Sequence, residues 1–176
     1  MSHDESVPKN TSSGATGLQE DDTGHLRVMI FKLGDEQYGT PLLEVREVIK
    51  FLAIKSVPFM ADYFKGVINL RGQIVSVIDL RKKFSMPIYA NERGLILVIE
   101  RPEGLVGCIV DDLISVEMFN LSEIASKSYI ESRIPKEFFI GIAKRGDALV
   151  SLINLAGCLT VDDMRLVSRT QKELVA

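Results

Sequence analysis

Residues 65–80 read KGVINLRGQIVSVIDL, two apolar runs separated by a short charged turn. The second run is too densely apolar to be a strand with one solvated face. Between the runs, Gly72 offers the positive φ that a short hairpin needs. The stretch therefore predicts a β-hairpin with Arg71 held at a rigid tip. The alternative is that Arg71 only keeps a turn soluble.

The same pattern returns later in the chain, which indicates an internal duplication. A shift of 75 positions places VSVIDL, residues 75–80, on VSLINL, residues 150–155. The same shift of 75 also matches Phe64 with Phe139 and Gly66 with Gly141. The earlier hairpin is repeated at a shift of 68, which matches residues 30–31 with 98–99, Gly39 with Gly107 and residues 44–45 with 112–113. Two matched pairs of hairpins in the same order predict two similar β-units in tandem. Short strands and frequent turns favour small barrels or closed sheets over sandwiches, and units of roughly 60–70 residues should pack together on a shared apolar core.

The two copies differ at the hairpin tip. Where the first copy has Asn69, Leu70 and Arg71, the second has Lys144, Arg145 and Gly146. Both copies keep the glycines and the apolar strand, but only the first carries NLRG. The difference favours a functional role for Arg71 over a role as a residue that only keeps the turn soluble.

Composition divides the chain into a polar tail, two β-units and a C-terminal segment. Residues 1–24 hold almost no large apolar side chain and are predicted to be a disordered tail. We expect a first barrel subdomain over residues 25–90, a second over residues 91–163 and a helical tail over residues 164–176. The finer predictions are a hairpin over 28–40, a helical turn leading into a strand over 41–49, short helices over 59–65, 81–84 and 122–127, strands over 95–100 and 105–110, a hairpin over 138–155 and a helix start at 160–163.

Charge and hydropathy exclude several classes of protein. A net charge of −3 and a pI near 5.5, with no basic stripe, give no reason to expect nucleic acid. No apolar run approaches the roughly 20 residues of a membrane span, and there is no signal-peptide core. Cys108 and Cys158 lie in apolar segments and are predicted to be buried free thiols in a reducing compartment. A soluble, cytoplasmic protein without membrane insertion is expected.

The sequence favours a binding module over an enzyme. It contains no HExxH, GxSxG, P-loop or CxxC motif. The histidines, His3 and His25, fall in or beside the polar tail, and Asp79 is matched by an asparagine in the other copy. Residues 111–112 are predicted to form a solvated turn, and Glu44 and Glu47 a solvated face. We expect no catalytic residue, no metal and no cofactor.

Four segments strongly resemble the CheW family of chemotaxis coupling proteins. They are FKLGDEQYGTPLLEVREVI, FKGVINLRGQIVSVIDLRKKF, LVIERPEGLVGCIVDDLISV and FIGIAKRGDALVSLINL, and the similarity runs from about Arg27 to Asp163. NLRG followed by VIDLR is the most specific part. The resemblance implies two tandem SH3-like five-stranded β-barrels packed on a shared apolar core, with short helices.

The resemblance also implies a non-catalytic adaptor in bacterial chemotaxis. Its partners would be the cytoplasmic tips of chemoreceptors and the regulatory domain of the histidine kinase CheA, in receptor arrays at the inner membrane. The receptor-binding residues it implies are Val45, Glu47, Lys65, Gly66, Arg71 and Gly72. For the kinase contact, one end of the first barrel is implied, where we choose Asp35, Glu36, Tyr38 and Leu42.

Two other classes of function stay open. One is a CheW-like scaffold of a non-flagellar system, such as pilus or gliding control. The other is an undetected enzyme, which would need a cleft holding paired carboxylates with perturbed pKa values.

Overall fold

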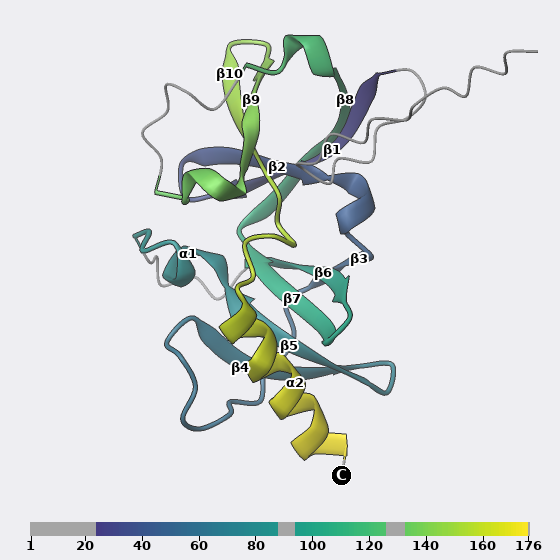
Figure 1. The fold of residues 1–176 in the computed structure, drawn as a ribbon, viewed down its shortest axis with the longest axis vertical. Helices are drawn as coiled ribbons and strands as arrows, with labels where there is room; N and C mark the ends of the chain where they lie inside the picture. Colours follow the sequence, from purple (N-terminus) through teal and green to yellow (C-terminus); the bar gives the residue numbers. More distant parts are fainter. Residues whose placement is uncertain (1–23, 88–93, 126–132, 176) are drawn as a thin grey trace, which may run out of the picture.

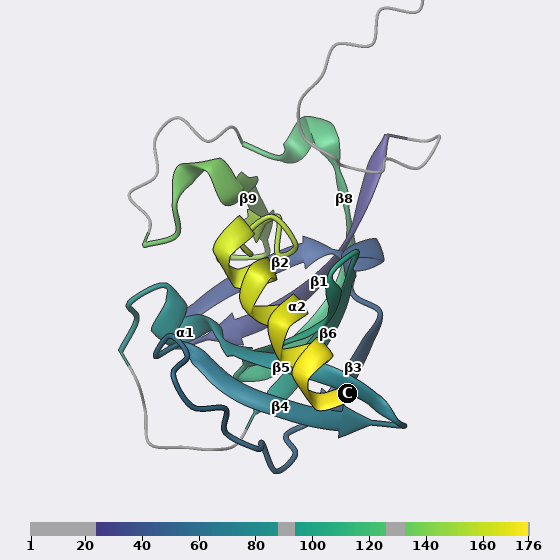
Figure 2. The same cartoon turned by 60° about the horizontal axis from the view of Figure 1, so that its bottom comes forward.

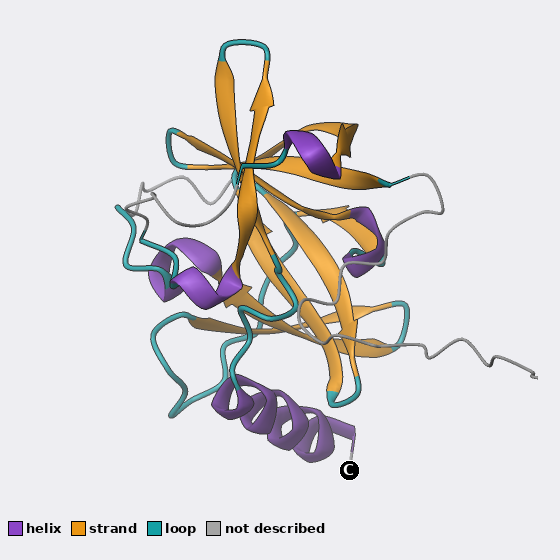
Figure 3. Cartoon of the chain, turned by 45° about the horizontal axis from the view of Figure 1, so that its top comes forward, coloured by secondary structure: helices purple, strands orange, loops and turns teal. Residues whose placement is uncertain are grey.

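The computed structural model describes residues 24–87, 94–125 and 133–175, which form mostly strands with a few short helices (Figures 1 and 3). In chain order the strands are β1 (His25–Leu33), β2 (Glu36–Pro41), β3 (Glu47–Lys50), β4 (Phe64–Leu70), β5 (Gln73–Asp79), β6 (Leu95–Arg101), β7 (Gly104–Val110), β8 (Asp112–Asn120), β9 (Phe139–Arg145) and β10 (Ala148–Ile153). The helices are η1 (Leu42–Glu44), α1 (Leu80–Lys83), η2 (Leu121–Glu123), η4 (Lys136–Phe138) and α2 (Val161–Val175). The expected mostly-β fold with short helices and a C-terminal helix is confirmed.

The strands form two five-stranded sheets, stacked along the long axis of the molecule (Figure 1). Barrel A has the strand order β8-β1-β2-β10-β9, and barrel B has the order β3-β6-β7-β5-β4. Each barrel thus combines the first hairpin of one copy of the repeat with the later strands of the other copy. The expected boundary between residues 90 and 91 is therefore wrong as a division between barrels. A parallel neighbour requires a long connection, and the chain supplies it by crossing between barrels, which pairs β2 with β10 and β5 with β7.

Strand register shows the duplication directly. Three strand pairs of barrel A each have an equivalent in barrel B. The pair Ile30–Gly39 corresponds to Val98–Gly107, Gly141–Leu152 corresponds to Gly66–Val77, and Ile30–Ser115 corresponds to Val98–Glu47. These pairs repeat the shifts of 68 and 75 read from the sequence. The two barrels are therefore related by internal pseudo-symmetry, as predicted.

A single backbone bridge closes each barrel. Lys55 pairs with Val67 in barrel B, and Ala125 pairs with Ile142 in barrel A. Gly66 lies beside the first bridge with φ of 136°, and a Cβ there would come within 2.1 Å of the Lys55 carbonyl oxygen. Barrel closure therefore requires a residue without a side chain at this position.

Three apolar clusters fill the molecule. The interior of barrel A is lined by Leu26, Val28, Ile30, Phe119, Ala143, Val150 and Leu152, and the interior of barrel B by Ile68, Val75, Val77, Ile96, Val98 and Leu105. The largest cluster joins the barrels and includes Phe31, Leu33, Tyr38, Phe64, Ile78, Leu97, Ile99, Phe139 and Ile153. The expected shared core is confirmed, and burial of this surface favours one body over two separable domains.

Some predicted elements are wrong in detail. The helix expected over residues 59–65 is absent, because residues 58–59 and 62–63 form turns and β4 begins at Phe64. Proline opens a β-turn as readily as a helix, and Phe59 adopts a positive φ of 60° that ends any helix. The short helix near residue 122 begins earlier, at Leu121. It ends at Glu123, because Ile124 is extended and Ala125 forms the bridge to Ile142. Residues 126–127 of the predicted helix and residues 1–23 of the polar tail lie outside the described residues.

Helix α2 crosses one face of barrel B, packed against β5 and β7 (Figure 2). Its start is a capping box, in which the Thr160 N–H donates to Asp163 Oδ2 at 2.6 Å and the Asp163 N–H donates back to Thr160 Oγ1 at 3.3 Å. The same carboxylate accepts from Lys83 Nζ at 2.6 Å and from the Tyr63 hydroxyl at 2.7 Å. Because the Asp163 side chain is fully buried, these donors fix α2 to barrel B.

Cys108 and Cys158 are buried free thiols, as predicted. Burial raises the pKa of Cys108 to about 12, which keeps the thiol protonated and unreactive. Among the residues that the structure describes, no helix is long and apolar enough to cross a membrane.

Candidate functional site

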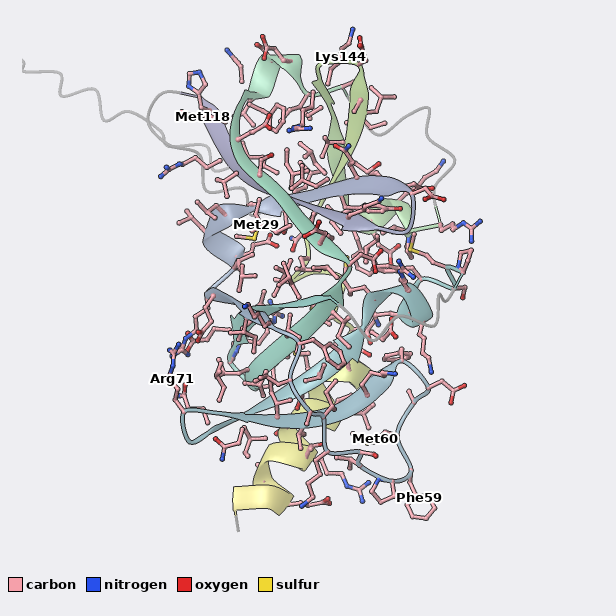
Figure 4. All side chains as sticks on the ribbon, turned by 180° about the vertical axis from the view of Figure 1, so that it is seen from behind. Met29, Phe59, Met60, Arg71, Met118 and Lys144 are labelled. Atoms are coloured by element: carbon pink, nitrogen blue, oxygen red, sulfur yellow. The ribbon has the colours of Figure 1, made fainter. Side chains whose placement is uncertain are left out.

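Arg71 stands at the tip of the β4–β5 hairpin, at the outer edge of barrel B (Figure 4). Leu70 pairs with Gln73, so the loop has two residues, Arg71 with φ of 52° and Gly72 with φ of 86°. Positive φ at both loop residues matches the right-handed twist of the strands. Asn69 supports the turn, since its Oδ1 accepts the Gly72 N–H at 2.8 Å. The NLRG sequence thus builds a rigid tip, as predicted.

The Arg71 side chain extends into solvent and pairs with Glu47. Arg71 Nη2 lies 3.2 Å from Glu47 Oε2, and the side chains are 79% and 23% exposed, respectively. Strand β3 places Glu47 in register with Val98, on the rim of the same barrel. An ion pair this exposed contributes about 0–1 kcal/mol to folding, so the fold does not depend on it.

A second polar bridge, which the sequence did not predict, lies beside the first. Arg46 Nη1 lies 3.3 Å from Glu100 Oε2, and Arg46 Nη2 donates to Gln73 Oε1 at 3.3 Å. The three residues come from the segment before β3, from β6 and from β5. Only barrel closure brings such distant segments together, so no spacing in the sequence could reveal the bridge.

The other residues expected to face a receptor differ in how exposed they are. Gly72 is exposed at the tip, whereas Lys65 and Val45 are half-buried, with Val45 packed against the shared core. Gly66 is buried and carries no side chain outward, so it acts through barrel closure. The structure brings Glu47, Arg71 and Gly72 to one rim and leaves Gly66 beneath the surface.

The residues chosen for a kinase contact do not form one patch. Asp35 and Glu36 are exposed at the start of β2, and Leu42 follows its far end, roughly 20 Å away at 3.3 Å per residue. The choice of Tyr38 as a contact is wrong for this state, because its ring is fully buried in the shared core. Its hydroxyl donates to Glu36, and burial raises the pKa of Tyr38 far above its usual value.

Asp111 was expected in a solvated turn, and this expectation is wrong. Its carboxylate pairs with Arg81 of α1 and accepts the Gly34 N–H at 2.6 Å. Gly34 belongs to the β1–β2 turn of barrel A, whereas Arg81 follows β5 of barrel B. Asp111 is therefore a structural link between the barrels.

The matched pair Asp79 and Asn154 has a shared structural role. Asp79 Oδ1 accepts the Lys82 N–H at 3.2 Å, and Asn154 Oδ1 accepts the Gly157 N–H at 2.6 Å. An amide and a carboxylate cap the same turn equally well. As inferred from the sequence, the charge of Asp79 is dispensable for the fold.

Glu44 is half-buried and accepts hydrogen bonds from another part of the chain. Burial raises the pKa of Glu44, and hydrogen bonds from the Thr40 hydroxyl at 2.6 Å and the Ala156 N–H at 3.2 Å oppose that rise. These contacts anchor η1 to the segment after β10. The prediction of a solvated face is therefore wrong for Glu44.

Within residues 24–87, 94–125 and 133–175, no group of three or more histidine, cysteine, aspartate or glutamate side chains could hold a metal ion. What the rim of barrel B presents is a set of exposed, paired charges on a rigid frame. Such a surface is suited to binding another macromolecule.

Comparisons with known proteins agree with this reading. The CheW-like domain model matches residues 27–163. The chain is 30% identical over 145 residues to the chemotaxis protein CheW of Klebsiella aerogenes, covering 82% of this chain and 87% of that protein. It is 28% identical over 90 residues to Protein PilI of Pseudomonas aeruginosa, covering 51% of each. The crystal structure of the scaffolding protein TtCheW from Thermoanaerobacter tengcongensis superposes with a TM-score of 0.70 and 30% identity, covering 78% of this chain and 90% of that one.

Proposed function

Because this chain belongs to the CheW-like domain family of chemotaxis scaffolds, we propose that it couples the cytoplasmic tips of chemoreceptors to the histidine kinase CheA. It acts as a non-catalytic adaptor, recruited to receptor arrays at the inner membrane. The observation that carries the proposal is the exposed Arg71 on a hairpin tip that the fold would keep without it.

The receptor side of the proposal rests on the rim of barrel B. Glu47, Arg71 and Gly72 lie there, and the half-buried Val45 comes two residues before Glu47. Lys65 and Gly66 lie toward the other end of β4, roughly 20 Å along the strand from Arg71 at 3.3 Å per residue, so they belong to a separate part of the barrel. A receptor tip is a helical coiled coil, and a helix places side chains three and four residues apart on one face. A rim with fixed charges can pair with such a face, which gives specificity and orientation.

The kinase side is assigned to the η1 end of barrel A. Leu42 is half-buried there, and the adjacent Leu43 is 74% exposed. A single exposed apolar side chain is common on protein surfaces, so Leu43 adds an apolar contact to this end without marking an interface by itself. Asp35 and Glu36 lie at the opposite end of β2 and are left as a weaker, separate choice.

Co-sedimentation with receptor tips and kinase tests the proposal. Arg71→Ala should weaken retention on receptor tips at least about tenfold, as for a hot-spot residue. Its unfolding free energy should stay within about 1 kcal/mol of wild type, because the ion pair is exposed. Arg145→Ala is the matched control, since it removes an arginine from the equivalent hairpin of barrel A and should retain binding.

Two results would count against the proposal. Equal losses of receptor binding for Arg71→Ala and Arg145→Ala would mean that binding depends on the net charge of the chain and not on a specific contact at Arg71. A large drop in the thermal midpoint of Arg71→Ala would mean that the residue is structural.

A second candidate is a CheW-like scaffold of a non-flagellar chemosensory system. The similarity to Protein PilI favours it, although that match covers only half of each chain. Purifying the kinase that this chain retains without ATP, and identifying the receptor in the same complex, would separate the two assignments.

A further inference from the structure

A hollow of about 340 Å³ opens in the rim of barrel B beside the Arg71 tip. Its lining includes Arg46, Gln73, Glu100, Arg101, Pro102 and Leu105. Gly72 and Gln73 both line it and directly follow Arg71 in the chain. The hollow is therefore continuous with the surface assigned to the receptor.

The hollow carries more positive charge than its own residues neutralise. Two arginines, Arg46 and Arg101, line it with one carboxylate, of Glu100, with which Arg46 is paired at 3.3 Å. Outside the hollow, Arg101 lies close enough to Glu44 for its charge to oppose the rise that burial causes in the pKa of that carboxyl. The Arg101 Nε is buried and has no hydrogen-bond partner among the described residues. A buried donor without a partner is unfavourable, and an incoming acceptor relieves that penalty.

Barrel architecture does not demand these charges. In barrel A the positions equivalent to Arg46, Glu100 and Arg101 are Ile114, Lys32 and Leu33. Leu33 is fully buried in the shared core, so an apolar residue serves the fold at the position of Arg101. The charged lining is therefore a feature of barrel B alone, like Arg71 itself.

We propose that this hollow is a second anchoring point for the receptor. An aspartate or glutamate of the receptor's helical tip places its carboxylate in the hollow, between Arg46 and Arg101. The inference rests on the proposed function, since it extends the same rim. Guanidinium groups bind carboxylates through paired, charge-assisted hydrogen bonds. One helix face can place one side chain at Arg71 and another, a turn away, in the hollow.

The test uses the full chain and the purified cytoplasmic fragment of its chemoreceptor, with affinity measured at low and high salt. Arg101→Gln and Arg46→Gln should each weaken binding roughly tenfold and reduce its salt dependence. Arg101→Lys keeps the charge but loses the planar fork, so an intermediate loss is expected. The control is Arg165→Gln, which neutralises an exposed arginine on α2 and should bind as wild type.

A charge swap separates contact with the receptor from an internal role. Combining Arg46→Glu with Glu100→Arg keeps an ion pair at this place but moves the guanidinium. If the swapped chain binds as weakly as Arg46→Gln, Arg46 contacts the receptor; if it regains wild-type affinity, Arg46 acts only through its bridge and the inference is overturned for that residue.

Failure of this inference is distinct from failure of the proposed function. If Arg71→Ala weakens binding while both Arg46→Gln and Arg101→Gln bind as wild type, the rim binds the receptor but the hollow does not. If the wild-type chain does not bind the receptor fragment, the proposed function itself is wrong.

Discussion

The tips of the β4–β5 and β9–β10 hairpins occupy the same place in their barrels but carry different residues. The first loop residue is Arg71 with φ of 52° in barrel B and Gly146 with φ of 57° in barrel A. Glycine adopts this conformation freely, whereas a side chain there costs roughly 1 kcal/mol. The fold therefore requires only a positive φ at this position, which favours glycine. Barrel B has an arginine there despite the cost.

Charge pairing at the two tips leads to the same conclusion. In barrel A, Arg145 Nε lies 2.5 Å from Glu117 Oε1, and both side chains are about one-third exposed. In barrel B the pair is shifted by one position along the hairpin, so that Arg71 projects from the tip and is 79% exposed. The comparison teaches that the strands set the shape of both hairpins, whereas the residue at the turn is free to differ, and it is at this residue that we propose the partner contact.

The largest expected effect concerns a feature of barrel B alone, the docking of α2. Asp163→Ala should lower the free energy of unfolding by about 3–5 kcal/mol, because it leaves the Lys83 ammonium, whose side chain is 10% exposed, without its carboxylate. Chemical denaturation at pH 7 measures this. A loss under 1 kcal/mol would show that α2 does not depend on this pair.

The same residue predicts a pH dependence. Burial alone would favour the neutral acid, but hydrogen bonds from Lys83, Tyr63 and the Thr160 N–H hold the pKa of Asp163 below its usual value. A lowered folded-state pKa gives stability that is fully present above the unfolded pKa near 4 and is lost as pH falls through the folded value. Wild type should therefore lose stability below pH 4 more steeply than Asp163→Asn, in denaturation curves recorded from pH 6 to pH 2.

The next largest effect comes from a feature that both barrels share, the glycine beside each closing bridge. A Cβ at Gly66 or Gly141 would approach the carbonyl oxygen of Lys55 or Ala125 to 2.1 or 2.6 Å. Either alanine variant should be destabilised by about 2–3 kcal/mol, more at Gly66, where φ is also positive. Thermal unfolding compares them, and a tolerated Gly66→Ala would contradict this account of barrel closure.

A smaller effect is expected from moving the arginine to the other tip. Gly146→Arg places a side chain where φ is 57° and should destabilise the chain by about 1 kcal/mol. Combined with Arg71→Ala, it should not restore binding to receptor tips, because barrel A offers Ser115 where barrel B has Glu47. Restored binding would show that any arginine on a hairpin tip suffices.

The smallest effect is the most diagnostic. Arg71→Gly relieves the strained turn and should be about 0.5 kcal/mol more stable than wild type, while losing receptor binding as Arg71→Ala does. Urea denaturation and co-sedimentation on the same samples measure both. A chain that becomes less stable would indicate that Arg71 supports the fold.

The repeat, the barrel architecture, the shared core and the hairpin at Arg71 could be predicted from the sequence. Alternation, turn residues and the shifts of 68 and 75 are local signals, and they recur whenever the same local structure recurs. The helix start at Thr160 to Asp163 was predicted for the same reason. The resemblance to the CheW family added Glu47 and Arg71 as residues of one receptor-binding surface, which no spacing indicates.

What could not be predicted depends on segments far apart in the chain. The exchange of strands between barrels is invisible in a repeat, because tandem and interleaved arrangements give the same sequence pattern. The bridge from Arg46 to Glu100 and the link from Asp111 to Arg81 arise only after the barrels close. Tyr38 was misplaced because an aromatic ring near a turn looks exposed until both barrels pack on it.

The two parallel contacts, β2 with β10 and β5 with β7, also determine when the molecule can form. Strand β10 follows the other strands of barrel A along the chain, so barrel A stays open until residues 148–153 have left the ribosome. Barrel B likewise cannot close until the β6–β7 hairpin has been synthesised. Contacts that span so much of the chain form slowly, and they leave unpaired edges open to aggregation during synthesis.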